Sequence, residues 1–211
     1  MKLYVYDHCP FCCKARMIFG LKQLPLELHT LLENDVDTPT RLVGKKTAPI
    51  LEKEDGSHMA ESMDIVHYLD ARYGQPLVTP VPDSAIKAWH DAAWRPILQL
   101  AIPRLAAADL GEFATAEARE AFRVRQTRNF GDFEQLIANT PQLAANVGQQ
   151  LAELDKLLAG REHVDEDDFV LYPSLRMLSI VKAVSLPTAV KDYMQRMERD
   201  TGVPLHFDQA V

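Results

Sequence analysis

Cysteine is missing from almost the whole chain. All three cysteines of the 211 residues lie between Cys9 and Cys13. Cysteines packed this closely cannot tie distant segments together, so a disulfide-stabilised scaffold is excluded. A structural zinc site normally takes its second pair of ligands from a distant segment, and the remaining histidines form no such pair. The sequence therefore contains one concentrated thiol site.

Long apolar runs and a surplus of basic residues are also missing. No stretch approaches the roughly 18 apolar residues of a membrane-spanning helix. Asp7 and His8 interrupt the N-terminal stretch before the apolar core of a signal peptide forms. Lys and Arg number 23 against 30 Asp and Glu, giving a net charge of −7, which argues against a general nucleic-acid binder. We therefore expect a cytoplasmic protein that binds neither membranes nor nucleic acid.

The first 73 residues alternate between strand and helix patterns. Strands are expected at 2–6, 25–29, 48–52 and 57–60, and helices at 11–22, 37–43 and about 62–73. Asp55-Gly56 is typical of a hairpin turn between the last two strands. Ser62 is a candidate N-cap of the last helix. The predicted order is βαβαββα.

The rest of the chain is expected to be all-helical. The stretch 74–83 contains three prolines and predicts a linker between two domains, 1–73 and 84–211. Helices are expected at about 84–108, 115–138, 142–159, 166–183 and 187–200. Pro96 and Pro103 are expected to kink or split the first of these. Asp165 is expected to cap the fourth, with Asp168 as its partner.

Two groups of side chains in the helical part are interpreted as structural. The large aromatic residues are expected to lie in the core rather than to line a cleft between domains: Trp89, Trp94, Tyr172 and Tyr193. A basic run is interpreted as a solvated helix face: Arg119, Arg123, Arg125 and Arg128.

The stretch Cys9-Pro10-Phe11-Cys12-Cys13 predicts a redox dithiol. A C-x-x-C pair between a strand and a helix is typical of thiol–disulfide chemistry. Free N–H groups and the helix dipole at a helix N-terminus favour a thiolate, so the pKa of Cys9 is expected to lie below its ordinary value of about 8.5. Cys12, one turn further along, is placed to attack a mixed disulfide on Cys9.

Two alternatives apply to the same stretch. His8 with the three cysteines forms a local metal-ligand cluster, although the missing second pair disfavours a metal site. Cys13 is interpreted as a small buried apolar residue, with a second resolving thiol as the alternative. We expect no metal.

Thr47-Ala48-Pro49 places a proline at the start of a predicted strand. Proline is excluded from the centre of a sheet because it cannot donate to the ladder. We predict a cis Ala48–Pro49 peptide bond that turns the backbone of Ala48 toward a substrate, with a plain edge-strand proline as the alternative.

Glu61-Ser62 lies at the start of a predicted helix. The hydroxyl of Ser62 and the helix N–H groups form a site for a carboxylate, and Glu61 can bind an ammonium group. The γ-glutamyl end of glutathione presents both groups on one carbon. The alternative is an ordinary N-cap.

These motifs match a known family. Through Cys9-Pro10-Phe11-Cys12, Thr47-Ala48-Pro49 and Glu61-Ser62, the first 73 residues resemble the thioredoxin-fold domain of glutaredoxins. The helical remainder resembles the C-terminal domain of cytosolic glutathione transferases. The combination, including the stretches 14–20 and 61–68, resembles the glutaredoxin-2 type found in bacteria.

The resemblance implies a glutathione-dependent disulfide oxidoreductase. By motif position Cys9 is the nucleophile and Cys12 the resolving thiol. The implied glutathione-binding residues are Phe11, Ala48, Pro49, Glu61 and Ser62. The family pattern usually has Tyr at position 11 and Val at position 48, so this chain keeps the aromatic wall without its hydroxyl and has looser packing beside the proline.

Partners and competing functions follow from this assignment. The expected partners are glutathione and proteins that carry glutathione mixed disulfides or disulfides, and we expect a monomer. One alternative is a glutathione S-transferase that acts on electrophiles. The other is a redox-sensing interaction protein without enzymatic activity.

Overall fold

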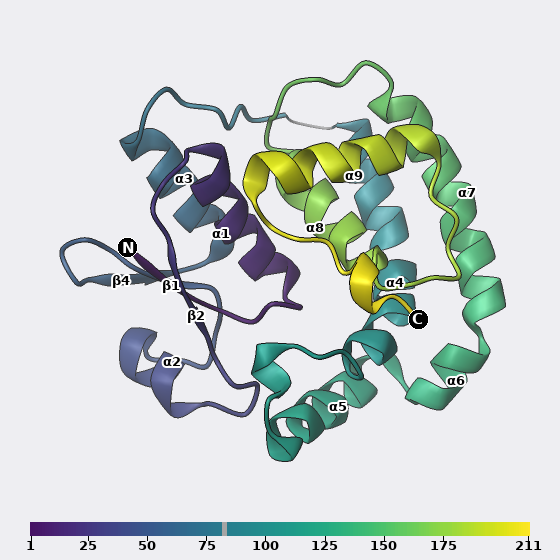
Figure 1. Ribbon diagram of the computed structural model, residues 1–211, viewed down its shortest axis with the longest axis horizontal. Helices are drawn as coiled ribbons and strands as arrows, with labels where there is room; N and C mark the ends of the chain where they lie inside the picture. The colour runs from purple at the N-terminus through teal and green to yellow at the C-terminus, as the bar shows by residue number, and fades with distance from the viewer. Residues whose placement is uncertain (82–83) are drawn as a thin grey trace. The chain divides into compact units, whose positions relative to one another are not determined.

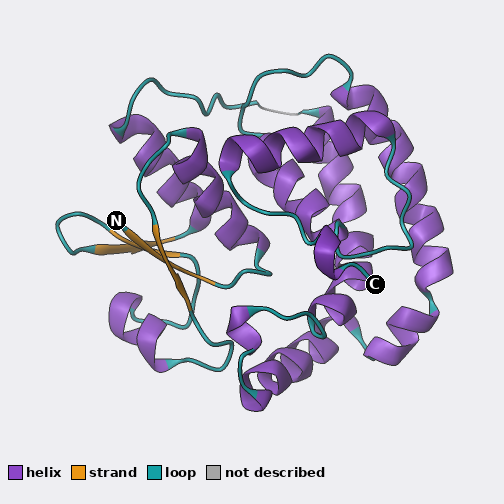
Figure 2. Cartoon of the chain, viewed as in Figure 1, coloured by secondary structure: helices purple, strands orange, loops and turns teal. Residues whose placement is uncertain are grey.

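The computed structural model describes residues 1–81 and 84–211 (Figures 1 and 2). These residues form two compact units. The first unit consists of Met1–Pro76 and Asp109–Arg125, and the second of Leu77–Ala108 and Gln126–Val211. The expected domain limits, 1–73 and 84–211, stay a prediction, and the last two residues of the expected linker, 82–83, lie outside the described residues.

The first unit is built on a four-stranded sheet with the strand order β2-β1-β3-β4. The parallel pair is β1 (Lys2–Val5) with β2 (Glu27–Thr30). On its other edge β1 runs antiparallel to β3 (Ile50–Glu52), which pairs antiparallel with β4 (His58–Ala60). The turn between β3 and β4 contains Gly56 at a φ of 77°, so the predicted hairpin is confirmed.

Helices cover both faces of this sheet. In Figure 1, α1 (Pro10–Leu21) and α3 (Ser62–Arg72) lie on one side of the sheet, and α2 (Asp37–Val43) lies on the other. The expected βαβαββα order is confirmed. Pro10 occupies the first turn of α1, where its missing N–H removes no hydrogen bond.

The apolar residues of the first unit form its core on both sides of β1. Fully buried side chains come from β1, α1, β3 and α3: Leu3, Met17, Ile18, Leu51 and Ile65. A separate cluster of Tyr4, Tyr6, Leu31 and Ile50 has Cys9 and Ala48 packed against it. The strand that precedes the dithiol, β1, and the strand that follows Pro49, β3, therefore contribute to the same apolar cluster.

A distant segment completes the first unit. Residues Asp109–Arg125 contain the short helix η1 (Gly111–Phe113) and most of α5 (Ala116–Phe130). The approach to β2 is close, because a Cβ on Gly111 would lie 3.2 Å from the side chain of Thr30. The sequence predicts that all of these residues belong to a helical domain. In the structure they pack instead with the N-terminal sheet.

The second unit is helical. Its helices are α4 (Ala85–Leu105), α6 (Phe133–Ala138), α7 (Thr140–Leu158), α8 (Asp168–Leu178) and α9 (Thr188–Thr201). Within it, α4 contacts α6, α7 and α8, and α9 packs on α7 and α8. Trp89, Tyr172 and Tyr193 are buried, so their assignment to the core is confirmed, while Trp94 is half-buried. Among the described residues, no helix has the length and apolarity needed to cross a bilayer.

Pro96 and Pro103 were predicted to kink or split the first of these helices, and the structure shows that they do not split it. Pro96 and Pro103 both lie inside α4, which continues from Ala85 to Leu105. An interior proline costs a helix about 3 kcal/mol. The packed face of α4, with Ile97 and Leu100 fully buried, offsets this cost.

The predicted helix over 115–138 is in fact two helices. Gly131 has a φ of 95° and ends α5, since right-handed helix is not possible at that angle. Asp132 then caps α6, its side chain accepting a hydrogen bond from the N–H of Gln135 at 3.0 Å.

The predicted cap of the fourth helix is also revised. Asp165 precedes α8, which begins at Asp168 and ends at Leu178, five residues before the expected end at 183. Asp165 and Asp168 still interact with each other, because the backbone N–H of Asp165 donates a hydrogen bond to the Asp168 carboxylate at 2.8 Å. Asp168 is drawn into the interior by Arg161 and by the hydroxyl of Tyr193, which lies 2.7 Å away.

Candidate functional site

The dithiol lies at the N-terminus of α1. Cys9 occupies the N-cap position with extended backbone angles, and its sulfur accepts a hydrogen bond from the N–H of Cys12 at 3.4 Å. Cys9 is partly exposed, while Cys12 is fully buried and Cys13 is 1% exposed. The expected burial of Cys13 is confirmed.

The two thiols of the C-x-x-C pair, Cys9 and Cys12, also differ in acidity. A hydrogen bond from the Cys12 thiol, the nearby charge of His8 and backbone N–H groups together lower the pKa of Cys9 to about 7, although burial opposes them. Burial raises the pKa of Cys12 well above its ordinary value. At neutral pH Cys9 therefore has a large thiolate fraction and Cys12 remains a thiol.

The basic side chains near the dithiol, Arg16 and Lys14, interact with groups other than the cysteines. Arg16 pairs with Asp7 and is largely buried. The ammonium of Lys14 lies 5.5 Å from the centre of the Phe11 ring, as in a cation–π contact.

A pocket of about 240 Å³ lies in the first unit beside the dithiol helix. It is lined by Phe11, Thr47, Ala48, Pro49, Glu61 and Ser62. The five residues expected to bind glutathione therefore come together, and Thr47 joins them. The Ala48–Pro49 peptide bond is cis, as predicted. Phe11 is 51% exposed and forms an open aromatic wall of the pocket.

Ser62 differs from its predicted role as a helix cap. It is the first residue of α3, and Glu61 occupies the N-cap position without a side-chain capping bond. Glu61 has a φ of 70°, which is rare for a residue with a side chain and is typical of ligand sites. Its carboxylate pairs with Lys45 at 2.9 Å, both side chains being exposed.

One pair of residues at the site was not found from the sequence. His8 Nδ1 lies 2.8 Å from the Oε1 atom of Glu112, and the backbone N–H of His8 donates to the same oxygen at 2.8 Å. His8 had been considered only as a metal ligand. Glu112 had no local signal at all, because its partner is 104 residues away in the chain.

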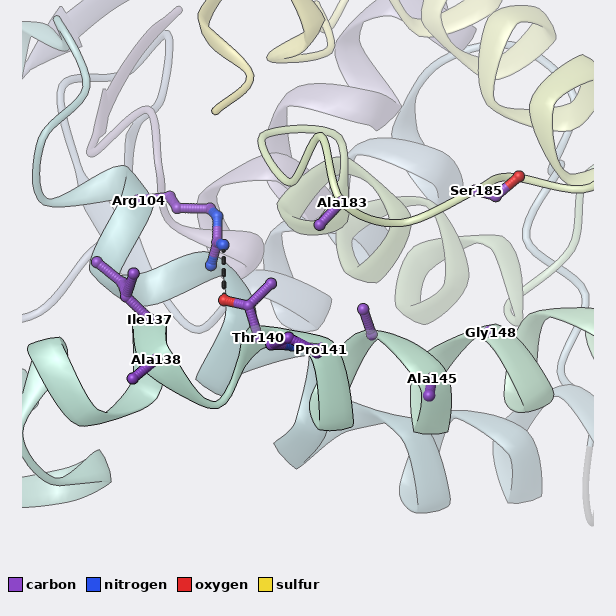
Figure 3. Close-up of a pocket in the computed structure, with 10 residues that line it drawn as sticks. Arg104, Ile137, Ala138, Thr140, Pro141, Ala145, Gly148, Ala183 and Ser185 are labelled. Atoms are coloured by element: carbon purple, nitrogen blue, oxygen red, sulfur yellow. Dashed lines mark hydrogen bonds between the residues drawn. The ribbon is translucent and has the colours of Figure 1, made fainter.

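A second pocket, of about 820 Å³, lies in the second unit (Figure 3). Small residues of α7 form much of its wall, including Ala144, Ala145 and Gly148. The guanidinium of Arg104 is already bonded to the Thr140 hydroxyl at 2.9 Å and to the carbonyl of Leu100 at 2.7 Å. The Arg104 guanidinium in this pocket therefore already has hydrogen-bond partners within the protein, and the described residues that line the pocket include no thiol.

Comparisons with known proteins match this arrangement over the whole chain. The model of the family described as "Glutaredoxin 2, C terminal domain" matches residues 85–210, and that of "Glutathione S-transferase, N-terminal domain" matches residues 3–77. Glutaredoxin 2 of Escherichia coli strain K12 is 44% identical over 215 residues, which cover all of both chains. The chain belongs to the glutaredoxin 2 family.

Solved structures agree with this assignment. Glutaredoxin 2 from Salmonella typhimurium, solved in complex with glutathione, is 42% identical, with a TM-score of 0.96 over all of this chain and 98% of that one. Gtt2 from Saccharomyces cerevisiae is 19% identical with a TM-score of 0.58 over 97% of this chain and 100% of that one, a likeness of fold alone. The present chain has the expected thioredoxin-like first part and helical second part. Its activity is that of a glutathione-dependent disulfide oxidoreductase, as the sequence predicted.

Proposed function

We propose that Cys9 is the nucleophile of this oxidoreductase and that Cys12 is its resolving thiol. The observation that carries the proposal is the difference between the two cysteines at the start of α1. Cys9 is partly exposed with a pKa lowered to about 7, while Cys12 is buried with a raised pKa. The attacking group in thiol–disulfide exchange is a thiolate, and an attacking thiol with a pKa near the working pH is the most effective.

The reaction with a protein–glutathione mixed disulfide needs Cys9 alone. The Cys9 thiolate attacks the glutathione sulfur, the disulfide bond breaks, and the protein thiolate leaves and takes up a proton. A second glutathione, as its thiolate, attacks the glutathione sulfur now bound to Cys9. Oxidised glutathione forms and the Cys9 thiolate is regenerated, so that one free glutathione thiol is consumed and one protein thiol is released for each mixed disulfide reduced.

The reaction with a protein disulfide also uses Cys12. Cys9 attacks one sulfur of the disulfide and forms a mixed disulfide with the protein. Cys12 then loses its proton and attacks the Cys9 sulfur, which releases the reduced protein and leaves a Cys9–Cys12 disulfide. Two glutathione molecules restore the dithiol. Burial of Cys12 disfavours its thiolate, so this second step is expected to be the slower one.

We propose that the 240 Å³ pocket binds glutathione. Phe11 contacts its thiol end, and the backbone of Ala48, turned by the cis bond to Pro49, pairs with its cysteinyl backbone. Glu61 binds the ammonium of the γ-glutamyl end, and Ser62 with the first N–H groups of α3 binds its carboxylate. The glutathione bound to the Salmonella relative and the shared support of Cys9 and Ala48 favour this assignment.

The setting and partners follow from the same chemistry. We propose glutathionylated and disulfide-containing proteins as substrates, a monomer as the working form, and the cytoplasm as the compartment, because turnover consumes reduced glutathione. We also propose the domain limits 1–73 and 84–211, which the two family matches at 3–77 and 85–210 support.

Glutathione-dependent reduction of a small mixed disulfide tests the mechanism. Cys9→Ser is expected to abolish activity, whereas Cys12→Ser and Cys13→Ser are expected to retain it. Full activity in Cys9→Ser would overturn the assignment of the nucleophile. A parallel assay for conjugation of a chlorinated aromatic compound separates this function from transferase activity, because thiol transfer should be fast and conjugation slow.

A further inference from the structure

The segment that returns to the first unit supplies a buried carboxylate next to the dithiol. Glu112 lies in η1, and its side chain has no exposed surface. Its Oε1 atom accepts two hydrogen bonds, both from His8: one from the ring and one from the backbone. The residue after His8 in the chain is Cys9, so these bonds act on the turn that carries the nucleophile.

The buried Glu112 carboxylate needs a charged partner. Its other oxygen, Oε2, is buried and has no hydrogen-bond partner among residues 1–81 and 84–211. A buried, half-satisfied carboxylate is costly unless a cation faces it. Burial works to raise the pKa of Glu112, yet the hydrogen bonds and charge of His8 outweigh it, and the pKa is lowered. Glu112 therefore remains negative beside the His8 ring.

Aromatic rings fix the position of the His8 imidazole. Tyr6 stacks on one side with its centroid 5.8 Å away, and Phe113 stacks at 5.4 Å. Phe122 meets the ring edge-on at 4.8 Å. His8 itself is 5% exposed. The ring is thus held in a low-dielectric site, where electrostatic interactions with neighbouring groups are strong.

The other charged groups around this pair are mostly matched with one another. Glu33, whose N–H donates to the carbonyl of Glu112, pairs with Arg125, and Arg16 pairs with Asp7. Arg119 lies over the Phe113 ring at 5.3 Å. The remaining titratable groups close to the turn are Tyr6, Cys9 and Cys12. His8 directly precedes Cys9 in the sequence, and positive charge on its ring lowers the pKa of Cys9.

We propose that Glu112 is a positioning residue for the Cys9 nucleophile: its carboxylate holds the His8 ring and the His8 backbone, and through them it stabilises the thiolate. The inference rests on the proposed role of Cys9. It assigns to the segment Asp109–Arg125, which follows the first helix of the second unit, a direct part in the chemistry of the dithiol.

The rate of Cys9 alkylation by iodoacetamide as a function of pH tests the proposal, with the Cys9 peptide followed by mass spectrometry in the full chain. Glu112→Gln keeps an acceptor for the His8 backbone but removes the charge. The midpoint is expected to rise by about one pH unit, the size of effect typical of one nearby charge. Thiol transfer at pH 7 should fall about fivefold and recover to within about twofold of wild type at pH 8.5, with KM for glutathione unchanged.

Two further variants keep the test decisive. Glu117→Gln removes an exposed carboxylate from the same segment and should leave both the midpoint and the activity at wild-type values. His8→Gln should raise the midpoint of Cys9 alkylation as Glu112→Gln does. If Glu112→Gln does not fold, the midpoint of His8→Gln tests the proposal in its place. A wild-type midpoint in either variant, or a loss of activity that high pH does not restore, would overturn the proposal. The role of Cys9 would stand in that case, because it depends on the Cys9→Ser result alone.

Discussion

The backbone N–H of Cys12 donates a hydrogen bond to the Cys9 sulfur at 3.4 Å, across the first turn of α1. The thiol of Cys12 also stabilises the Cys9 thiolate and is the largest cause of its lowered pKa. If Cys9 is the nucleophile and Cys12 the resolving cysteine, as we propose, Cys12 therefore activates Cys9 before it attacks it. A helix N-terminus makes this possible, because it offers free N–H groups to the residue at the cap.

The first prediction concerns the pH dependence of this thiolate. Because the pKa of Cys9 is about 7, its alkylation rate should rise with pH through a midpoint near 7, below the value of about 8.5 for a free cysteine. Cys12→Ala removes the thiol donor and should raise the midpoint, while Cys12→Ser keeps a donor and should raise it less. Equal midpoints in the Ala and Ser variants would argue against the thiol hydrogen bond as the main cause.

The second prediction concerns glutathione affinity. Glu61→Gln removes the charge proposed to bind the ammonium group, and the site is exposed, so we expect KM for glutathione to rise by about five- to tenfold. The maximal rate should change less, because the charge lies away from the reacting sulfur. Glu54→Gln, an exposed carboxylate on the β3–β4 turn outside the pocket, is the matched control. The same KM in both variants would remove Glu61 from the binding site.

The third prediction concerns the stability of the first unit. Arg125 on α5 pairs with Glu33, whose side chain is fully buried. Arg125→Ala leaves that carboxylate without its cation, and the free energy of unfolding in urea should fall by about 2 kcal/mol. Arg123→Ala breaks an exposed pair with Glu120 instead and should change it by less than about 0.5 kcal/mol. Similar losses of unfolding free energy in both variants would mean that the buried pair stabilises the protein no more than the exposed pair does.

The fourth prediction compares one substitution at two glycines of the second unit. Gly148 lies inside α7, where an added Cβ meets nothing within 4 Å, so Gly148→Ala should stabilise the protein by about 0.5–1 kcal/mol. Gly131 has a φ of 95°, where a side chain is strained, so Gly131→Ala should destabilise it by about 1–2 kcal/mol. Thermal unfolding measures both, and shifts of the same sign would contradict this interpretation.

The interpretation of the basic run shows where sequence reasoning reached its limit. Four arginines at helical spacing were expected to form a solvated face. Arg125 instead neutralises Glu33, a residue 92 positions away in the chain. Neither residue has a local pattern that announces the other, since a charge on a helix surface and a charge facing a buried partner look alike in sequence.

Local chemistry explains what the sequence determined by itself. The dithiol, the proline of the first turn, the cis Ala48–Pro49 bond and the Asp55-Gly56 turn each depend on a few adjacent residues, whose backbone preferences act at short range. Glu61 and Ser62 were recognised in the same way, although only the structure showed that Glu61, not Ser62, holds the cap position.

Tertiary structure alone decided how these motifs are supported. It placed the return segment Asp109–Arg125 against the sheet, and it brought Glu112 to His8. It also kept α4 continuous through two prolines. In each case burial and long-range pairing outweighed local preference, because a buried charge or an apolar face must find its partner wherever the chain supplies one.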